Sequence, residues 1–369
     1  MSALFIGSNI YRGSSYGPFH PLSIPRVPTV IDLARALGWL SPAQYRTSPR
    51  AKPAALSLFH TEDYIRAVQD AETTQAVNDD VRVRYGLGTL SNPVFPEMYR
   101  RPATAAGGSL MGAMLIKAGG HVFNPGGGTH HGLSDRANGF CYFNDPVLAL
   151  MTLRAQGLQR ILYIDVDAHH CDGVEAAFMG AEDVFLISVH EKDRWPFTGA
   201  FADDAGGAAL NLPVPRGFND SEFDHLMDHV ILPAVERYAP QAVVLQCGAD
   251  AVLEDPLARL ALSNRCHVKM VAALKERCSR LLVLGGGGYN PWTVGRCWTA
   301  IWATLAGYDI PDRLPDAAQD VLRGLRWSRK AQPQEHHWTT LLDTPRPGPV
   351  RPEIADLAQK AIQRVEYWS

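Results

Sequence analysis

Short apolar runs recur along the chain, and each of them leads into a turn rich in glycine or polar residues. They include ALFIG (3–7), HVFNPGGG (121–128), RILYIDVD (160–167), DVFLISVH (183–190), QAVVLQCGAD (241–250) and RLLVLGGGGY (280–289). Apolar residues occupy consecutive positions of these runs rather than alternate ones. This pattern predicts strands that are buried on both faces, as in a parallel sheet.

The segments between the runs have helical periodicity. In 221–238 the apolar residues Phe223, Leu226, Val230 and Ile231 fall on one helical face, and Ser221 is the predicted N-cap. The segment 267–280 repeats this pattern directly before a strand. Strands that alternate with helices predict a single α/β domain with a doubly wound, mostly parallel sheet flanked by helices. In such sheets ligands bind beyond the carboxyl ends of the strands.

We expect one domain over residues 1–369, with a core at about 3–310 and a C-terminal extension at 311–369 that wraps the surface. The stretch 308–352 is rich in Pro, Arg and Asp and is predicted to be an irregular connection before a last helix at 352–367. The pair His336–His337 lies in this polar stretch and is predicted to be solvent-exposed.

Composition and charge narrow the class of protein. Of the 369 residues, 46% are hydrophobic and 20% are charged, which excludes a disordered or fibrous chain. A net charge of -3, from 35 basic and 38 acidic residues, argues against a broadly basic surface for nucleic acid. We also expect no membrane span, because no apolar run approaches the ~20 residues that a span needs. We expect no secretory signal, because the first residues, MSALFIGSNIYRGSS, lack a basic segment followed by a long apolar stretch.

The cysteines are scattered and form no CxxC pair. They are Cys141, Cys171, Cys247, Cys266, Cys278 and Cys297. This spacing favours isolated small apolar side chains in a reducing compartment, so the expected location is the cytoplasm. No heptad or exposed apolar stripe is evident, and the oligomeric state stays open.

The most informative stretch is IDVDAHHCDG, at the end of a predicted strand. Its three carboxylates and two imidazoles cannot be buried together without a cation or dense hydrogen bonding. Asp165, Asp167 and His169 occupy alternate positions and can converge on one side, and a second strand end delivers Asp250. Asp167, His169 and Asp250 would then form a three-ligand site with an open position, as in catalytic zinc sites. The alternative is a solvated acidic turn or a salt-bridge network.

Two further clusters follow predicted strands. In GGGTHHGLSDRANGFCYFND, the adjacent His130 and His131 suit proton transfer, with Asp165 and Asp172 as candidate carboxylate partners. The turn GGGGYN has no following Lys-Ser/Thr, which argues against a phosphate-binding loop, and it places Tyr289 at a strand end. A phenol there can stabilise a developing oxyanion, although a buried core tyrosine is the alternative.

Together these motifs, in this order, resemble the zinc-dependent histone deacetylase family, in the class I-like branch that includes the bacterial acetoin-utilisation deacetylases and histone deacetylase-like amidohydrolases. The resemblance runs over roughly residues 10–305, from IYRGSSYGPFHPLSIPRV to GGGGYNPWTVGRCWTAIW. It implies the arginase/deacetylase fold and an amidohydrolase that releases acetate, or another short carboxylate, from an acylated amine.

The resemblance also implies roles for individual residues. His130 and His131 would be general base and acid, Asp165 and Asp172 would orient them, and Tyr289 would hold the oxyanion. The ligands of Zn²⁺, whose site Fe²⁺ can also occupy, would be Asp167, His169 and Asp250. A structural K⁺ would be held by the Asp165 and Asp167 carboxylates, Ser188, and the carbonyls of His169 and Val189. The substrate tunnel would be lined by Gly139, Phe140, Trp195, Leu257 and Gly287. Arg26 would line a channel below the site, unless it is a salt-bridged surface residue.

One departure bears on the substrate. Many lysine deacetylases carry an acid on a rim loop that holds the substrate backbone, whereas the corresponding stretch here, 86–99, offers Ser91 and Asn92. The leading hypothesis is removal of acetyl or short acyl groups from the ε-amine of lysine in proteins. The first alternative, which the missing rim acid makes more plausible, is the same chemistry on acetylated small amines such as acetylpolyamines.

Two more distant alternatives complete the set. One is a ureohydrolase with paired manganese ions, which would need additional carboxylate and histidine ligands at the same strand ends. The other is a non-catalytic module that binds acyl-lysine and retains only the pocket.

Overall fold

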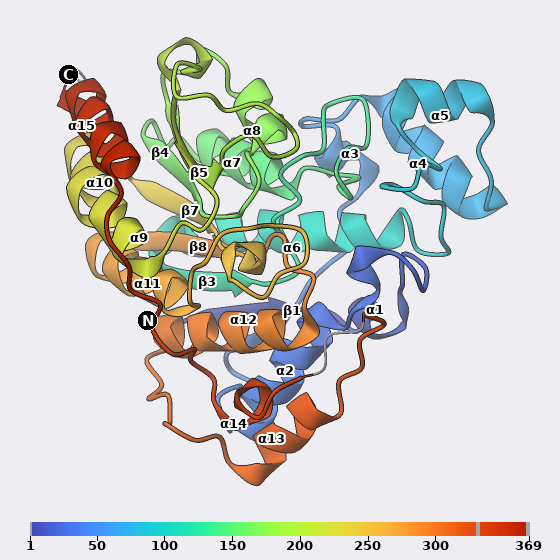
Figure 1. The fold of residues 1–369 in the computed structure, drawn as a ribbon. Helices are drawn as coiled ribbons and strands as arrows, with labels where there is room; N and C mark the ends of the chain where they lie inside the picture. Colours follow the sequence, from blue (N-terminus) through green and yellow to red (C-terminus); the bar gives the residue numbers. More distant parts are fainter. Residues whose placement is uncertain (1, 330–332, 367–369) are drawn as a thin grey trace.

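The computed structural model describes residues 2–329 and 333–366, and its centre is one parallel sheet (Figure 1). Among the described residues the sheet has eight strands in the order β2-β1-β3-β8-β7-β4-β5-β6, and every neighbouring pair is parallel. The strands are β1 (Leu4–Gly7), β2 (Tyr45–Thr47), β3 (Gly120–Asn124), β4 (Ile161–Asp165), β5 (Val184–Glu191), β6 (Ala209–Val214), β7 (Ala242–Gln246) and β8 (Arg280–Leu284). The predicted fold class is confirmed.

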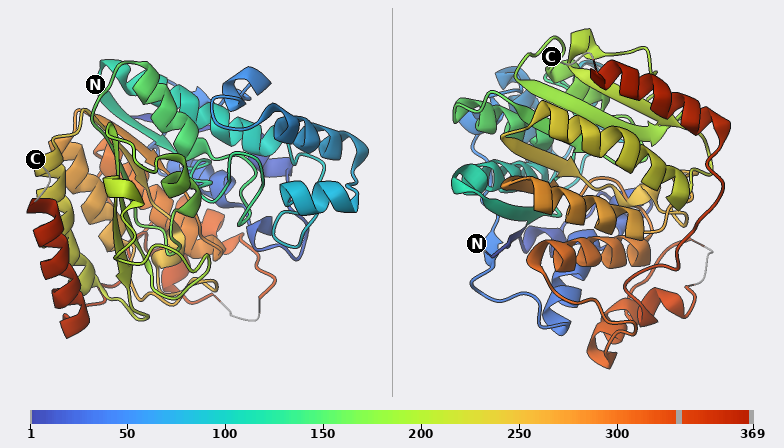
Figure 2. Two further views of the ribbon diagram at one scale, coloured as in Figure 1. Left: turned by 90° about the horizontal axis from the view of Figure 1, so that it is seen from above. Right: turned by 90° about the vertical axis from the view of Figure 1, so that its left-hand side faces the viewer.

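Helices cover both faces of the sheet, which explains why the strands are continuous apolar runs (Figure 2). In β4, Leu162 and Ile164 pack into one buried cluster, whereas Ile161 and Tyr163 pack into the other. The first cluster includes side chains of α2 (Arg26–Ala36), α9 (Asp220–Leu226), α10 (Leu232–Tyr238), α11 (Arg265–Arg277) and α12 (Pro291–Ala306). The second includes α6 (Arg100–Leu115), α7 (Asp145–Ala155) and α8 (Asp172–Ala177).

The remaining helices lie beside this layered core. They are α1 (Ile10–Gly13), α3 (Pro53–Leu56), α4 (Glu62–Thr74), α5 (Asp79–Tyr85), α13 (Asp316–Arg323), α14 (His336–Thr339) and α15 (Pro352–Glu366). Side chains of α3, α4 and α5 share a third buried cluster with residues of the loop that follows them. No helix of the described chain is long and apolar enough to cross a bilayer.

The strand order determines where polar loops meet. Because β3, β8, β7 and β4 are adjacent and parallel, their carboxyl ends lie at the same edge of the sheet. The loops that leave this edge are 125–131, 285–289, 247–250 and 166–171. The polar motifs that the sequence analysis identified therefore all lie at this edge of the sheet.

Some local predictions differ from the structure. The helix predicted at 221–238 begins one residue earlier, and its cap is Asn219, whose Oδ1 accepts hydrogen bonds from the backbone N–H groups of Ser221 and Glu222. The Glu222 carboxylate accepts the Asn219 N–H in return and completes a capping box. The prediction of Ser221 as the cap is wrong. The edge strands β2 and β6 were not predicted, because β2 is short and polar and β6 contains Pro213, which only an edge tolerates.

The stretch 308–352 is more ordered than predicted. It contains α13 and α14, and it places Leu314, Leu322 and Leu341 in the same core cluster as the sheet. The last helix, α15, runs alongside α9 and the helical turn Met227–Ile231 that continues it (Figure 2). The expectation of a purely irregular connection is therefore wrong, because its apolar side chains are buried by the main core.

One buried ion pair fastens α15 to the body and gives a testable stability effect. Burial opposes ionisation of Glu222, but hydrogen bonds from Arg351 Nε (2.5 Å) and Nη2 (2.7 Å) outweigh it and hold the pKa of Glu222 below its usual range. A lowered folded-state pKa stabilises the protein above the unfolded-state pKa of ~4.3, and this stabilisation is lost as the pH falls. Glu222→Gln should lower the free energy of unfolding by about 2 kcal/mol at pH 7.

Denaturant unfolding at pH 7 and pH 3 checks this effect. The difference between the variant and the wild type should shrink at pH 3, because the wild-type carboxyl is then losing its charge. Glu353→Gln is the control, since Glu353 is exposed and lies 3.8 Å from the same guanidinium. An equal loss at both pH values would show that the charge of Glu222 contributes nothing.

Candidate active site

Asp167, His169 and Asp250 meet at the carboxyl edge of β4 and β7. These three residues are called the metal cluster. The Nδ1 atom of His169 lies 3.0 Å from Asp250 Oδ2 and 3.2 Å from Asp167 Oδ1. All three side chains are buried, and their ligand atoms lie within 4.8 Å of one another. The structure thus brings together the three residues that the sequence predicted as metal ligands.

The surroundings of the metal cluster fit a small divalent cation. Two carboxylates buried this close to each other repel, and a single imidazole compensates only part of their charge. Glycines border the cluster: a Cβ atom at Gly287 would lie 2.0 Å from Asp250 Oδ2, and one at Gly248 would lie 2.1 Å from Asp167 Oδ2. The donor set of one nitrogen and two carboxylates is one that Zn²⁺ and Fe²⁺ accept.

His130 and His131 stand beside the metal cluster, and each has a carboxylate behind it. His130 Nδ1 lies 2.7 Å from Asp165 Oδ2, and His131 Nδ1 lies 2.6 Å from Asp172 Oδ1. The ring centroids of the two histidines are 4.0 Å apart, and His130 Nε2 is 3.8 Å from Asp167 Oδ1. The pairing predicted from the sequence is the one that the structure contains, and it fixes both rings through Nδ1.

The two histidines differ in their affinity for a proton. Burial disfavours the charged form of both rings, but the carboxylates of Asp165 and Asp167 outweigh burial at His130 and raise its pKa to about 9. At His131, burial and the neighbouring His130 outweigh Asp172 and lower the pKa to about 4. Such a divergent pair is typical of sites that use one group as acid and the other as base.

Tyr289 closes the site from the loop after β8. Burial, followed by the nearby Asp250 and Asp167 carboxylates, raises the pKa of Tyr289 well above its usual value, so its hydroxyl keeps its proton. The ring of Phe140 packs edge-on against Tyr289 at a centroid distance of 5.8 Å. Tyr289 belongs to a buried apolar cluster and also lines the cavity beside the histidines, so its protonated hydroxyl is available as a hydrogen-bond donor there.

A cavity of about 280 Å³ leads from the surface to these groups. Its walls are Ser91, His131, Gly139, Phe140, His169, Arg194, Trp195, Leu257 and Tyr289. Gly139, Phe140, Trp195 and Leu257 therefore lie where the sequence predicted a tunnel. Gly287 borders the smaller cavity below it together with Arg26.

Arg26 belongs to the lower cavity and forms no ion pair among the described residues. Its Nη1 donates to the Gly286 carbonyl oxygen, and its guanidinium lies 5.2 Å from the centroid of the Trp298 ring. The alternative of a salt-bridged surface arginine is wrong, because the side chain turns inward.

The rim residues differ in orientation. Ser91 is exposed and lines the mouth of the cavity, and its carbonyl oxygen lies 3.2 Å from His20 Nε2. Asn92 is buried and donates to the Cys141 carbonyl, so it does not face a substrate. The described residues that line the mouth include no acidic side chain.

Of the five residues of the expected potassium site, Asp167 and His169 belong to the metal cluster, and Asp165, Ser188 and Val189 lie on the neighbouring strands β4 and β5. Asp165 pairs with Ser188 across β4 and β5, and Val189 follows Ser188 in β5. Asp165 Oδ1 accepts a hydrogen bond from the backbone N–H of Asp167, and His169 lies two residues further on. Ser188 Oγ lies 2.9 Å from His190 Nδ1.

Two supporting residues were not found from the sequence. The Tyr163 hydroxyl donates to Asp165 Oδ2 at 2.6 Å, and Asn138 Nδ2 donates to Asp172 Oδ2 at 3.2 Å. Each of them fixes a carboxylate that contacts a histidine. Tyr163 has a detectable signal, since it precedes Asp165 by two residues and so shares its strand face. Asn138 lies in a loop and has none.

Gly139 gives the second testable prediction. It adopts a φ of +52°, and a Cβ atom there would lie 2.2 Å from the Trp195 ring and 2.8 Å from His131 Cδ2. Gly139→Ala should displace both rings and narrow the tunnel, so kcat/KM for an acetylated substrate should fall at least ~10-fold.

Gly157→Ala is the matched control. Gly157 has a φ of +88° with nothing within 4 Å of the added Cβ, so it tests the same backbone strain without the contact. Both variants should lose about 1–2 kcal/mol of stability. If kcat/KM were unchanged in Gly139→Ala, or fell equally in both variants, the tunnel would not run past Gly139.

Comparison with known proteins agrees with this geometry. The histone deacetylase domain family matches residues 20–305. The acetoin utilization protein AcuC of Bacillus subtilis is 30% identical over 379 residues, covering 99% of this chain and 97% of its own. Putative histone deacetylase 2 of Caenorhabditis elegans is 35% identical over 309 residues, covering 81% of this chain and 61% of its own. The chain thus spans less than two thirds of that longer relative.

The fold has a solved counterpart. The crystal structure of a histone deacetylase homologue from Aquifex aeolicus superimposes with a TM-score of 0.91 at 35% identity, covering 98% of this chain and 100% of that one. A solved complex of a histone deacetylase homologue with SAHA matches equally well. The resemblance noted in the sequence is confirmed, and proteins of this kind are metal-dependent hydrolases of amide bonds. This chain belongs to the histone deacetylase family.

Proposed function

We propose that this protein is a zinc-dependent amidohydrolase that removes acetyl or short acyl groups from the ε-amine of lysine in proteins. The observation that carries the proposal is the convergence of the metal cluster, the histidine pair and Tyr289 at the inner end of one narrow cavity. A non-catalytic acyl-lysine module would need the cavity walls but neither the two His–Asp pairs nor a protonated phenol.

Asp167, His169 and Asp250 would hold the cation. When bound, it would polarise the amide carbonyl and lower the pKa of a water molecule, which is the contribution that divalent metals make to hydrolysis at neutral pH. We propose Zn²⁺ as the resident metal, with Fe²⁺ as the alternative that the same donors accept. We propose a structural K⁺ beside it, held by Asp165, Asp167, Ser188 and the carbonyls of His169 and Val189.

The histidine pair would move the protons. His131 is neutral at pH 7, and its Nδ1 is engaged by Asp172, so its Nε2 is available to accept a proton from the attacking water. His130 is held in its charged form by Asp165 and Asp167, so we propose it as the general acid, which reverses the order of base and acid that the resemblance implied. The proton then passes to the amine nitrogen as the amide bond breaks, and acetate and a free amine result.

Tyr289 would stabilise the oxyanion that develops on the carbonyl oxygen. Its hydroxyl is protonated and buried, and a donor that is already oriented in a dry site stabilises developing charge without reorganisation. Phe140 packs edge-on against the Tyr289 ring and restricts its rotation.

The mouth of the cavity favours acyl-lysine over acetylpolyamines. A polyamine carries a second ammonium group and needs an acidic partner at the rim, but none of the described lining residues supplies one. The guanidinium of Arg194, which lines the mouth, is already bound to the Glu191 carboxylate and the Leu257 carbonyl. An apolar lysine stem can instead lie between Phe140, Trp195 and Leu257.

A panel of substrates tests the proposal. Metal-loaded protein is assayed for acetate release from an acetyl-lysine peptide and from N-acetylputrescine, with Tyr289→Phe as the control. We expect turnover of the peptide at a kcat/KM at least ~10-fold above that of the small amine, and collapse in the control. Turnover of N-acetylputrescine alone would indicate instead that the protein acts on acetylated small amines. Binding of the peptide without turnover would favour the non-catalytic module.

The ureohydrolase alternative has less support. A second metal ion would need further carboxylate and histidine ligands, but the group of potential ligands at this site comprises only Asp167, His169 and Asp250 among the described residues. We propose the cytoplasm as the location, because all six cysteines are buried and unpaired.

A further inference from the structure

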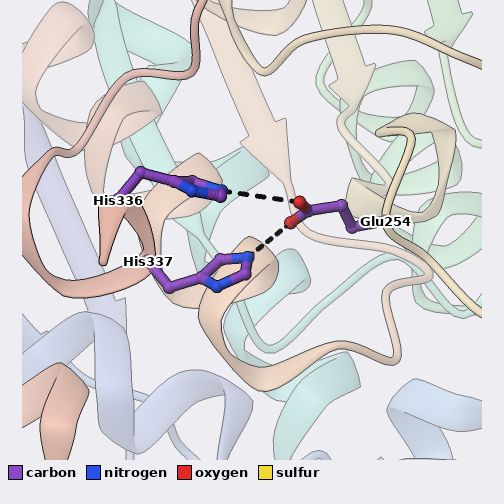
Figure 3. Close-up of side chains that lie close together, drawn as sticks. All are labelled: Glu254, His336 and His337. Carbon is purple, nitrogen blue, oxygen red and sulfur yellow. Dashed lines mark hydrogen bonds and ion pairs between the residues drawn. The ribbon is translucent and has the colours of Figure 1, made fainter. Parts of the chain in front are cut away.

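A second cluster of titratable side chains lies outside the active site, where the C-terminal extension meets the loop after Asp250. Figure 3 shows His336 and His337, from α14, pointing at the carboxylate of Glu254. His337 Nε2 lies 2.6 Å from Glu254 Oε2, and His336 Nε2 lies 3.4 Å from Glu254 Oε1. His337 is buried, so the prediction that this pair is solvent-exposed is wrong for His337.

The hydrogen bonds of His337 identify its tautomer. Its Nδ1 accepts a hydrogen bond from the backbone N–H of Gln334 at 2.7 Å, so this nitrogen carries a lone pair. The proton of the neutral ring is therefore on Nε2 and is donated to Glu254. A metal on Nε2 would force the proton onto Nδ1, against the Gln334 N–H. Glu254 and His337 thus form a hydrogen-bonded clamp, called here the Glu254–His337 clamp, rather than part of a metal site.

The Glu254 carbonyl and the side chain of the next residue, Asp255, hold the active-site tyrosine and the residue that follows it. The Glu254 carbonyl accepts a hydrogen bond from Asn290 Nδ2 at 3.3 Å. The next residue, Asp255, accepts the backbone N–H of Tyr289 through Oδ2 at 2.7 Å and that of Leu257 through Oδ1 at 2.8 Å. Residues 254 and 255 therefore bracket Tyr289 and a wall of the tunnel.

The extension also contacts the helix that follows Tyr289. The ring of Trp292, in the first turn of α12, lies 5.8 Å from the His337 ring, and its Nε1 donates to the Leu322 carbonyl. Asn290 caps the same helix through hydrogen bonds from the backbone N–H groups of Trp292 and Thr293. Tyr289 is thus fixed from both sides by contacts that lead to α13 and α14.

We propose that Glu254 and His337 are positioning residues for Tyr289, through which the C-terminal extension holds the phenol at the reacting centre. This inference rests on the proposed function, in which Tyr289 stabilises the oxyanion. It gives the extension, which lies beyond the matched family domain of residues 20–305, a role in the rate of the reaction. Neither residue touches the substrate.

A double-mutant cycle tests the proposal. His337→Ala is made in the wild type and in Tyr289→Phe, and kcat and KM are measured for the acetyl-lysine peptide. In the wild type we expect kcat to fall about 10-fold with KM within about twofold, because a displaced phenol affects the transition state more than substrate binding. In Tyr289→Phe the same change should alter kcat less than about twofold, because the hydroxyl that it displaces is already absent.

Three further variants serve as a rescue, a control and a substitute in this cycle. His337→Gln keeps an N–H donor for Glu254 and should restore most of kcat. Glu335→Gln, in the same segment but exposed and facing Arg313, should behave as the wild type. If His337→Ala does not fold, His337→Phe keeps a ring against Trp292 while removing the donor, and it enters the cycle in its place.

The outcomes separate the two levels of the proposal. If Tyr289→Phe itself loses no activity, the role of Tyr289 in oxyanion stabilisation that the proposed function includes fails, and the positioning role fails with it. If Tyr289→Phe loses activity and His337→Ala lowers kcat equally in both backgrounds, only the positioning role is overturned. Binding of Zn²⁺ alone is then titrated. A second equivalent that is lost in His337→Ala would show that Glu254, His336 and His337 hold a metal and would overturn the clamp.

Discussion

Replacing Asp167 with alanine is expected to abolish bound metal and amide hydrolysis together. The substitution leaves His169 and Asp250 as the only ligands of the metal cluster, and two ligands do not hold a catalytic ion that normally has three. It also removes a carboxylate that helps to keep His130 charged. Since the metal supplies several kcal/mol of transition-state stabilisation, we expect kcat/KM to fall by at least ~10³-fold.

Metal analysis and acetate release on the same preparation check this prediction. Asp80→Ala is the control, because Asp80 is an exposed acid in α5, far from the metal cluster in the chain. The control should keep one metal ion per chain and full turnover. If Asp167→Ala kept both its metal and its activity, the assignment of the metal cluster would be wrong.

Replacing Tyr289 with phenylalanine should have the second largest effect, and it should leave the metal in place. The substitution removes only the hydroxyl and keeps the ring that packs against Phe140. Loss of a single oxyanion donor typically costs ~10²–10³-fold in kcat. KM should change little, because the hydroxyl interacts more strongly with the developing charge than with the ground-state carbonyl.

The pH profile of the variant adds a second readout. Its shape should match that of the wild type, since the hydroxyl of Tyr289 stays protonated throughout the range where the enzyme is active. Tyr85→Phe is the control, because its hydroxyl donates to Asp63 and does not line the cavity that Tyr289 borders. Wild-type kcat in Tyr289→Phe would mean that the oxyanion is stabilised by other groups.

The fold and the centre of the site could be predicted because they depend on local pattern and on one rule of topology. Consecutive apolar positions in 160–167 and 241–250 indicate strands buried on both faces. Parallel strands end at the same edge, so the polar residues after them meet. This reasoning placed Asp167, His169 and Asp250 together, and it paired the two histidines with Asp165 and Asp172.

The features that were missed depend on contacts between distant parts of the chain. Glu254 and His337 are 83 residues apart, and nothing in the polar composition around His337 indicates that it is buried. The inward turn of Asn92 follows from a hydrogen bond to the Cys141 carbonyl, which no periodicity reveals. The helix cap at Asn219 was missed because Asn and Ser are equally good caps, and the reciprocal bond from Glu222 decides between them.

The most direct test of the central claim is acetate release from an acetyl-lysine peptide by protein that has been stripped with a chelator and titrated with Zn²⁺. We predict that the stripped protein is inactive and that activity is restored in full at one equivalent of Zn²⁺ per chain. No release at any loading, or activity that requires two Mn²⁺ per chain, would contradict a mononuclear amidohydrolase built on Asp167, His169 and Asp250.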